Sequence, residues 1–118
     1  MRLTSEIWVR AYLRACGRAG ALAVVARHGD DDAGAIFIKV NRLDGTACVF
    51  GPAPAGFDRD MQDRQWIPHL DAPGTTEVEV DAYLRRQADF DPDLWVIEVE
   101  DREGRHYLDA WLARPMTY

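Results

Sequence analysis

Long hydrophobic runs and cysteines are scarce in this sequence, and both shortages restrict what the protein can be. No apolar run approaches the roughly 18 residues that a membrane-spanning helix needs. The opening MRLTSEIW lacks the charged, apolar and small-residue regions of a signal peptide. Cys16 and Cys48 are not in a CxxC spacing, so we expect two reduced thiols in the core. These features predict a cytoplasmic protein with no membrane segment.

Lysine and serine are nearly absent. Lys39 is the only lysine and Ser5 the only serine, and thirteen arginines carry the rest of the positive charge. Ser5 precedes an amphipathic segment, which favours a helix cap over a catalytic hydroxyl. Lys39 lies within the apolar stretch AIFIKVNRLDGTACVF, residues 35–50. Whether it binds a ligand or only occupies the wet face of a strand is the question that this stretch raises.

The charge is divided unevenly along the chain. Residues 1–29 carry a net +4, whereas the remainder carries −10, which together give the net charge of −6. The net negative charge of residues 30–118 argues against nucleic-acid binding, because contacts with phosphates require a concentrated patch of basic side chains. The basic N-terminal segment is suited instead to an acidic partner.

Motifs that would assign a chemistry are also missing. The three histidines show neither HxxxH nor HExxH spacing, and Asp30, Asp31 and Asp32 are consecutive rather than alternating as in a calcium loop. There is no GxGxxG or GxxxxGK[ST], and the prolines of GPAPAG remove amide donors. His106 near Glu100 or Asp101 is the one candidate acid–base pair, and such carboxylate–histidine neighbours also occur at many surface hairpins. We therefore expect no metal, assign no cofactor and name no catalytic residue.

Two segments have helical periodicity. The first runs from a cap at Ser5 to about Arg18, with one apolar face and a polar row of arginines at every fourth residue, Arg10, Arg14 and Arg18. The second begins with a capping box formed by Thr76 and Glu79 and runs to about Ala88. Its apolar stripe comprises Val80, Tyr83, Leu84 and Ala88.

Short β-branched segments predict the strands, at about residues 21–29, 35–42, 46–51 and 94–101, with a shorter one in QWIPHL. Asp44-Gly45 predicts a two-residue hairpin turn in which Val40 faces Val49 and Lys39 faces Phe50. A Glu103-Gly104 turn would pair 94–101 with a last strand at 106–113, although a short helix there is the alternative. Residues 51–74 form a long irregular loop, of the kind that is often functional or mobile.

These elements predict an α+β fold in a single domain, residues 1–118. The N-terminal amphipathic helix and the second helix would pack on a mainly antiparallel sheet of five or six strands.

The pieces RLTSEIWV, GAIFIKVNRLDG, FGPAP and FDPDLWVIEVEDREGR occur in this order over nearly the whole chain. In these pieces the sequence resembles a bacterial family known as domain of unknown function 1491. The resemblance implies a small bacterial protein and names no activity, cofactor or catalytic residue.

Two hypotheses for function follow from these observations. The first is a non-enzymatic binding or adaptor protein that acts through the first helix and the sheet face, with a protein partner or a second copy of itself. Its surface would include Arg10, Arg14 and Arg18. The second is a small enzyme or ligand-binding domain with a polar pocket between the sheet and the 51–74 loop. Its polar groups would be Lys39, Arg42, Glu98, Glu100 and His106.

Overall fold

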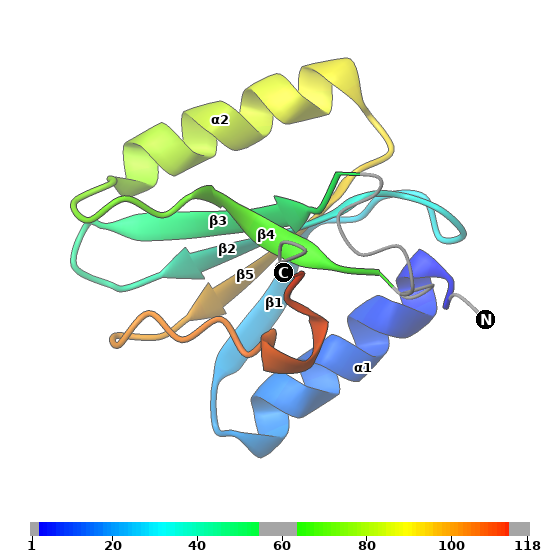
Figure 1. Cartoon of the computed structure of the whole chain (residues 1–118), viewed down its shortest axis with the longest axis horizontal. Helices are drawn as coiled ribbons and strands as arrows, with labels where there is room; N and C mark the ends of the chain where they lie inside the picture. Colours follow the sequence, from blue (N-terminus) through cyan, green and yellow to red (C-terminus); the bar gives the residue numbers. More distant parts are fainter. Residues whose placement is uncertain (1–2, 55–63, 114–118) are drawn as a thin grey trace, which may run out of the picture.

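The computed structural model describes residues 3–54 and 64–113 of the chain. Two α-helices, α1 (Ser5–Arg18) and α2 (Glu77–Phe90), accompany one five-stranded sheet and a short 3-10 helix, η1 (Asp109–Trp111). The strands are β1 (Leu22–Arg27), β2 (Ile36–Asn41), β3 (Ala47–Pro52), β4 (Trp66–Leu70) and β5 (Trp95–Glu100). As Figure 1 shows, α1 and α2 lie on opposite faces of the sheet. The predicted α+β architecture is confirmed.

The strand order is β1-β5-β2-β3-β4, so β5 lies between the first two strands of the chain. Three of the four pairings are antiparallel, and the pairing of β2 with β5 is parallel. In that parallel pair Ile38 is level with Ile97 and Lys39 with Glu98. The sheet is therefore mixed but mostly antiparallel, and its centre brings together residues about sixty positions apart.

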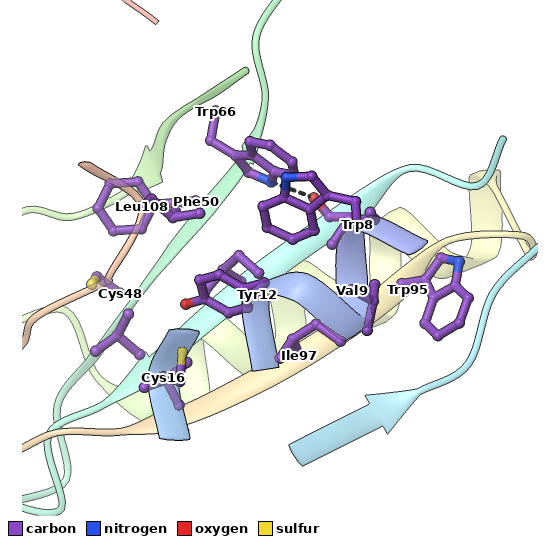
Figure 2. Packing of buried hydrophobic residues seen from close by; sticks show 14 residues of the cluster. Trp8, Val9, Tyr12, Cys16, Cys48, Phe50, Trp66, Trp95, Ile97 and Leu108 are labelled. Atoms are coloured by element: carbon purple, nitrogen blue, oxygen red, sulfur yellow. Dashed lines mark hydrogen bonds between the residues drawn. The ribbon is translucent and has the colours of Figure 1, made fainter. Parts of the chain in front are cut away.

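The face of the sheet that packs against α1 holds the larger core. Trp8 and Tyr12 of α1 are buried there with Trp66 and Trp95. Figure 2 shows the Trp8 ring stacked on that of Trp66. The two ring centroids are 4.1 Å apart. The two cysteines also lie in this core as buried free thiols, as the sequence indicated.

The face that packs against α2 holds a smaller apolar cluster, in which Val80 and Leu84 of the helix meet Phe37 and Val49 of the sheet. The helix begins where the capping box predicted, because the Thr76 side chain accepts a hydrogen bond from the Glu79 amide at 3.1 Å.

The cap of α1 is Thr4 rather than Ser5, so the sequence prediction was wrong by one residue. The Thr4 hydroxyl accepts from the Ile7 amide at 3.3 Å. Ser5 is instead fully buried; its hydroxyl donates to the Gly34 carbonyl at 2.6 Å and accepts from the Arg64 guanidinium at 2.7 Å. The only serine therefore connects α1 to the loop before β2.

The predicted register of the β2–β3 hairpin was also wrong by one residue. Lys39 is opposite Val49, not Phe50, because the loop has three residues, with Leu43 and Gly45 in the left-handed region at φ 66° and 89°. A one-residue change in register turns every side chain of a strand to the opposite face of the sheet. Cys48 and Phe50 consequently lie in the α1 core, whereas Ala47 and Val49 lie with α2.

The segment after β5 does not form the favoured hairpin strand. Both edges of β5 are already paired, one with β1 and the other with β2, so no position remains beside it for residues 106–113. That segment contains the 3-10 helix Asp109–Trp111, which corresponds to the short helix that the sequence analysis gave as the alternative to a strand. By contrast, the strand suggested in QWIPHL is confirmed as β4, and residues 55–63 of the long loop lie outside the described part.

Candidate functional site

The most distinctive polar group of the molecule is a cluster around Lys39, which we call the Lys39 cluster. The lysine amine donates to Glu77 Oε2 at 2.7 Å and to Asp81 Oδ1 at 2.8 Å, and lies 3.4 Å from Glu98 Oε1. Asn41 Nδ2 completes the cluster by donating to Glu77 Oε2 at 3.1 Å and to Glu98 Oε2 at 3.2 Å. One cation thus holds three carboxylates that come from two separate elements.

Backbone geometry accounts for the position of each member. Alternation along β2 directs Lys39 and Asn41 to the same face, and the parallel register with β5 sets Glu98 beside Lys39. Glu77 and Asp81 are one turn apart on α2, so both side chains reach the same point on the sheet. The cluster is therefore the point at which the first turns of α2 are attached to the middle of the sheet.

The environment keeps the amine protonated. Only 4% of Lys39 is exposed, and burial by itself would lower its pKa. The hydrogen bonds to Asp81 and Glu77 and the charge of Glu98 outweigh burial, and the pKa of Lys39 is raised. A protonated amine has no lone pair, so in this arrangement Lys39 is a donor and a counter-ion rather than a nucleophile or a base.

A cavity of about 250 Å³ adjoins the cluster between α2 and the β5 side of the sheet. Two arginines, Arg27 and Arg85, face it together with Lys39, Asp81 and Glu98. The remainder of its wall is apolar, from Ala26, Leu84, Ala88 and Val96. Charges of both signs around an apolar floor suit a small molecule that carries both a cation and an anion.

The other three predicted ligand-binding residues lie away from this cavity. Arg42 lines a separate cavity of about 370 Å³ with Cys48 and Asp71, between the β2–β3 hairpin and the segment before α2. Glu100 is level with Asn41 in the parallel pair, and it is half-buried. The five residues proposed from the sequence therefore do not converge on one cavity; only Lys39 and Glu98 do.

His106 forms no acid–base pair with the carboxylates next to it in sequence. Its Nδ1 accepts from the Leu108 amide at 2.8 Å, and its ring packs edge-on against Phe50. Asp101 is engaged elsewhere, by Arg105 and by the Tyr107 hydroxyl at 2.8 Å. Burial would raise the pKa of Asp101, but these hydrogen bonds and the Arg105 charge lower it to about 2. This cluster orders the turn after β5.

The arginine row of α1 is exposed along its length. Arg10, Arg14 and Arg18 all face solvent, and Arg10 is 3.6 Å from Glu6, one turn earlier. In the described part of the chain neither Arg14 nor Arg18 has a carboxylate partner. An exposed pair such as Arg10 with Glu6 contributes little to stability, so this row is not explained by the needs of the fold.

Sequence reasoning missed Glu77 and Asp81, although a signal was present. Both flank the stripe that α2 buries, three residues before Val80 and Leu84 respectively, and their side chains are only partly exposed. Acids beside a buried stripe lose part of their hydration, which favours a cationic partner on the facing sheet. Since Lys39 is the only lysine and lies in an apolar strand, it was the partner to test first.

Within residues 3–54 and 64–113, no group of three or more histidine, cysteine or acidic side chains is placed to hold a metal ion. Neither helix described has the length and apolar character needed to cross a membrane.

Comparison with known proteins gives a family and no activity. The family model for DUF1491, a protein of unknown function, matches residues 3–109. The crystal structure of a DUF1491 family protein from Caulobacter crescentus CB15 is 42% identical, with a TM-score of 0.77 over 97% of this chain and 100% of that one. The solution structure of protein Atu0922 from A. tumefaciens is 36% identical, with a TM-score of 0.78 over 99% and 100%.

No match was found among curated proteins. With nearly the whole length matched in both sequence and fold, the chain belongs to the DUF1491 family.

Proposed function

We propose that this protein is a non-enzymatic interaction protein whose α1 arginine row binds an acidic protein partner. The observation that carries the proposal is the exposed row itself, Arg10, Arg14 and Arg18, on a protein of net charge −6. An acidic protein gains nothing for its own fold from concentrating exposed arginines on one helix. Such a row favours encounter with an opposite charge.

The spacing of the arginine row indicates the shape and charge of the surface that would bind it. Residues four apart on a helix are about 6 Å apart along its axis, so the row offers three guanidinium groups over about 12 Å. A helix or strand with carboxylates at similar intervals would match it, and arginine accepts carboxylates in a bidentate geometry. The partner surface is therefore expected to be acidic and elongated.

The state of Lys39 supports a binding role over a catalytic one. Among the described groups it is the most buried cation of the α2 face, and its carboxylate partners raise its pKa and hold it protonated. A catalytic lysine requires the opposite environment, one that lowers the pKa and frees the amine.

The experiment is an affinity capture with wild type and the double variant Arg10→Glu with Arg14→Glu, followed by mass spectrometry and reassembly with the purified partner. Binding should be lost in the double variant and should weaken as salt is raised, since screening acts on exposed charges. The matched control is Arg86→Glu with Arg102→Glu, which reverses two exposed charges outside α1. A folded α1 variant that recovers the partner as well as the wild type would disprove the assignment of this surface.

The cavity beside Lys39 supports a second candidate, a ligand-binding domain or small enzyme for a molecule that carries both charges. Arg27 and Arg85 would hold its anion, and Asp81 and Glu98 its cation. A thermal-shift screen of amino acids and related zwitterions tests it, because a ligand of the native state raises the melting temperature. The shift should disappear in Arg27→Ala with Arg85→Ala. A screen in which no compound shifts wild type counts against this candidate.

A further inference from the structure

The two edges of the sheet are protected very differently. At one edge, β4 contains Pro68, which cannot donate to another strand, and Trp66 is bridged to Leu112. At the other edge, β1 has no strand beside it in the described part of the chain. Its residues 22–26 read LAVVA and carry no charge, no lysine and no proline.

The β1 edge is also unusually apolar for a surface. Leu22 is 59% exposed, Val24 50% and Val25 40%. Natural proteins cover or charge such edges, because unpaired backbone groups beside apolar side chains attract another strand. The exposure therefore points to an occupant for the edge.

We infer that β1 pairs antiparallel with β1 of a second copy of this chain, across a two-fold axis that passes beside Val24 perpendicular to the sheet. In this register Val24 faces Val24 of the other copy, and Ala23 faces Val25. Every central pair is then apolar, and the two five-stranded sheets become one continuous sheet.

The faces of the two copies agree in this arrangement. Leu22 and Val24 lie opposite Glu100 and Glu98 of β5, and therefore on the α2 side, whereas Ala23 and Val25 lie on the α1 side. A two-fold axis perpendicular to the sheet keeps each side chain on the face where it began. The α2 helices of both copies consequently lie on one face and the α1 helices on the other.

Charge complementarity selects a second copy over an unrelated strand. The bulge at Ala26 sets Arg27 opposite Val96, on the α2 side, where it is the next residue of that face after Val24. In the dimer Arg27 of one copy therefore lies beside Leu22 of the other, whose neighbour on β5 is Glu100. In the single chain the Arg27 guanidinium donates to the Pro92 carbonyl at 3.0 Å, so the contact with Glu100 requires this exposed side chain to turn toward the other copy. Two strand spacings are about 9.6 Å, which the arginine and glutamate side chains together can span. The axis creates this contact twice.

This surface does not depend on the acidic partner proposed for α1, and either can fail without the other. Sedimentation equilibrium of the purified chain from low micromolar to millimolar concentration tests it. Wild type should pass from monomer to dimer. The variant Val24→Lys should raise the dissociation constant of the dimer by about tenfold or more, because a lysine from each copy would meet at the axis. The matched control Val78→Lys makes the same change at a residue that is 76% exposed on α2, and it should leave the constant unchanged.

Charge exchange tests the register. Arg27→Glu and Glu100→Arg should each weaken the dimer, and the double variant should restore it, since the opposite charges then meet again across the axis. Arg10→Glu with Arg14→Glu should dimerise like wild type. A wild type that stays monomeric throughout, or a dimer indifferent to Val24→Lys, overturns the inference. A double variant no better than its single variants overturns the register described.

Discussion

The two faces of the sheet hold their helices by different physical means. On the α1 side the contact is a continuous aromatic core, in which Trp8 stacks on both Trp66 and Tyr12. On the α2 side a smaller apolar cluster surrounds a charged centre, where Lys39 binds Glu77 and Asp81 of the helix. Apolar burial is non-directional, whereas the ion cluster accepts only one position of α2. The first face thus supplies most of the stability and the second supplies orientation.

Removing the aromatic centre of the α1 side should have the largest effect. Trp8→Ala deletes a ring that is 2% exposed and leaves a cavity between Trp66 and Tyr12. We expect a loss of about 3–5 kcal/mol in the free energy of unfolding, measured by urea denaturation. Its control is Ile7→Ala, the adjacent helix residue, which is 49% exposed and should cost much less. Equal losses in the two variants would contradict the assignment of the core.

Removing the cation of the α2 side should have the next largest effect. Lys39→Met keeps the apolar stem but leaves Glu77, Asp81 and Glu98 without their common partner. We expect a loss of about 2–3 kcal/mol, less than for a fully buried pair because the carboxylates are partly exposed. Adding Glu77→Gln to Lys39→Met should recover part of the loss, since it removes one of the repelling charges. No recovery would mean that the amine matters through its packing alone.

A smaller effect separates two tryptophans of the α1 side. Trp66 Nε1 donates to the Ile36 carbonyl at 2.8 Å, whereas Trp8 Nε1 has no acceptor among the described residues. Replacement by phenylalanine removes a similar volume at both sites, but only Trp66→Phe leaves a buried carbonyl unsatisfied. Urea denaturation should show Trp66→Phe to be the more destabilising by about 1 kcal/mol. The reverse order would disprove this account of the two indoles.

The smallest expected effect is the pH dependence of the α2 side. Because the folded-state pKa of Lys39 is raised above its ordinary value, the stabilisation is complete below about pH 10.4 and is lost only as pH rises through the higher folded value. The stability difference between wild type and Lys39→Met should therefore vary by less than about 0.5 kcal/mol from pH 7 to pH 10. Melting temperatures across that range provide the check, and a gap that closes near pH 8 would contradict it.

Local patterns in the sequence were enough for both helices and for strands β1 to β5, because each has a clear period or cap, but they also favoured a strand at 106–113 that does not form. What they could not supply was pairing. The Asp44-Gly45 turn suggested two loop residues, but Leu43 also adopts a positive φ, and the extra residue shifted β3 by one position. The partner of β5 was misjudged for a related reason. A turn soon after β5 favours a hairpin between β5 and the residues that follow it. In the structure both edges of β5 are paired with other strands instead, one with β1 and the other with β2, as is typical of a buried strand.

The candidate site was half visible in the sequence. Lys39 and Glu98 were predicted to be among the polar groups of one pocket, and in the structure the parallel pair of β2 with β5 sets them level with each other. Arg42 and His106 were grouped with them only because all are polar and close to strands. Which polar residues share a cavity depends on where α2 crosses the sheet, and no local pattern encodes that crossing. The acids of α2 were the one clue, since they flank its apolar stripe.

The parallel pairing of β2 with β5 also determines when this sheet can form. Strands β1 and β2 follow one another in the chain, yet they never pair, because β5 occupies the position between them. The strand that separates β1 from β2 is therefore the last strand to be synthesised, and loop closure over some sixty residues must precede its docking. Such non-local contacts slow folding. Until residue 100 has been synthesised, β1 and β2 each have an edge that lacks its partner β5. Unpaired strand edges of this kind favour misfolding and aggregation.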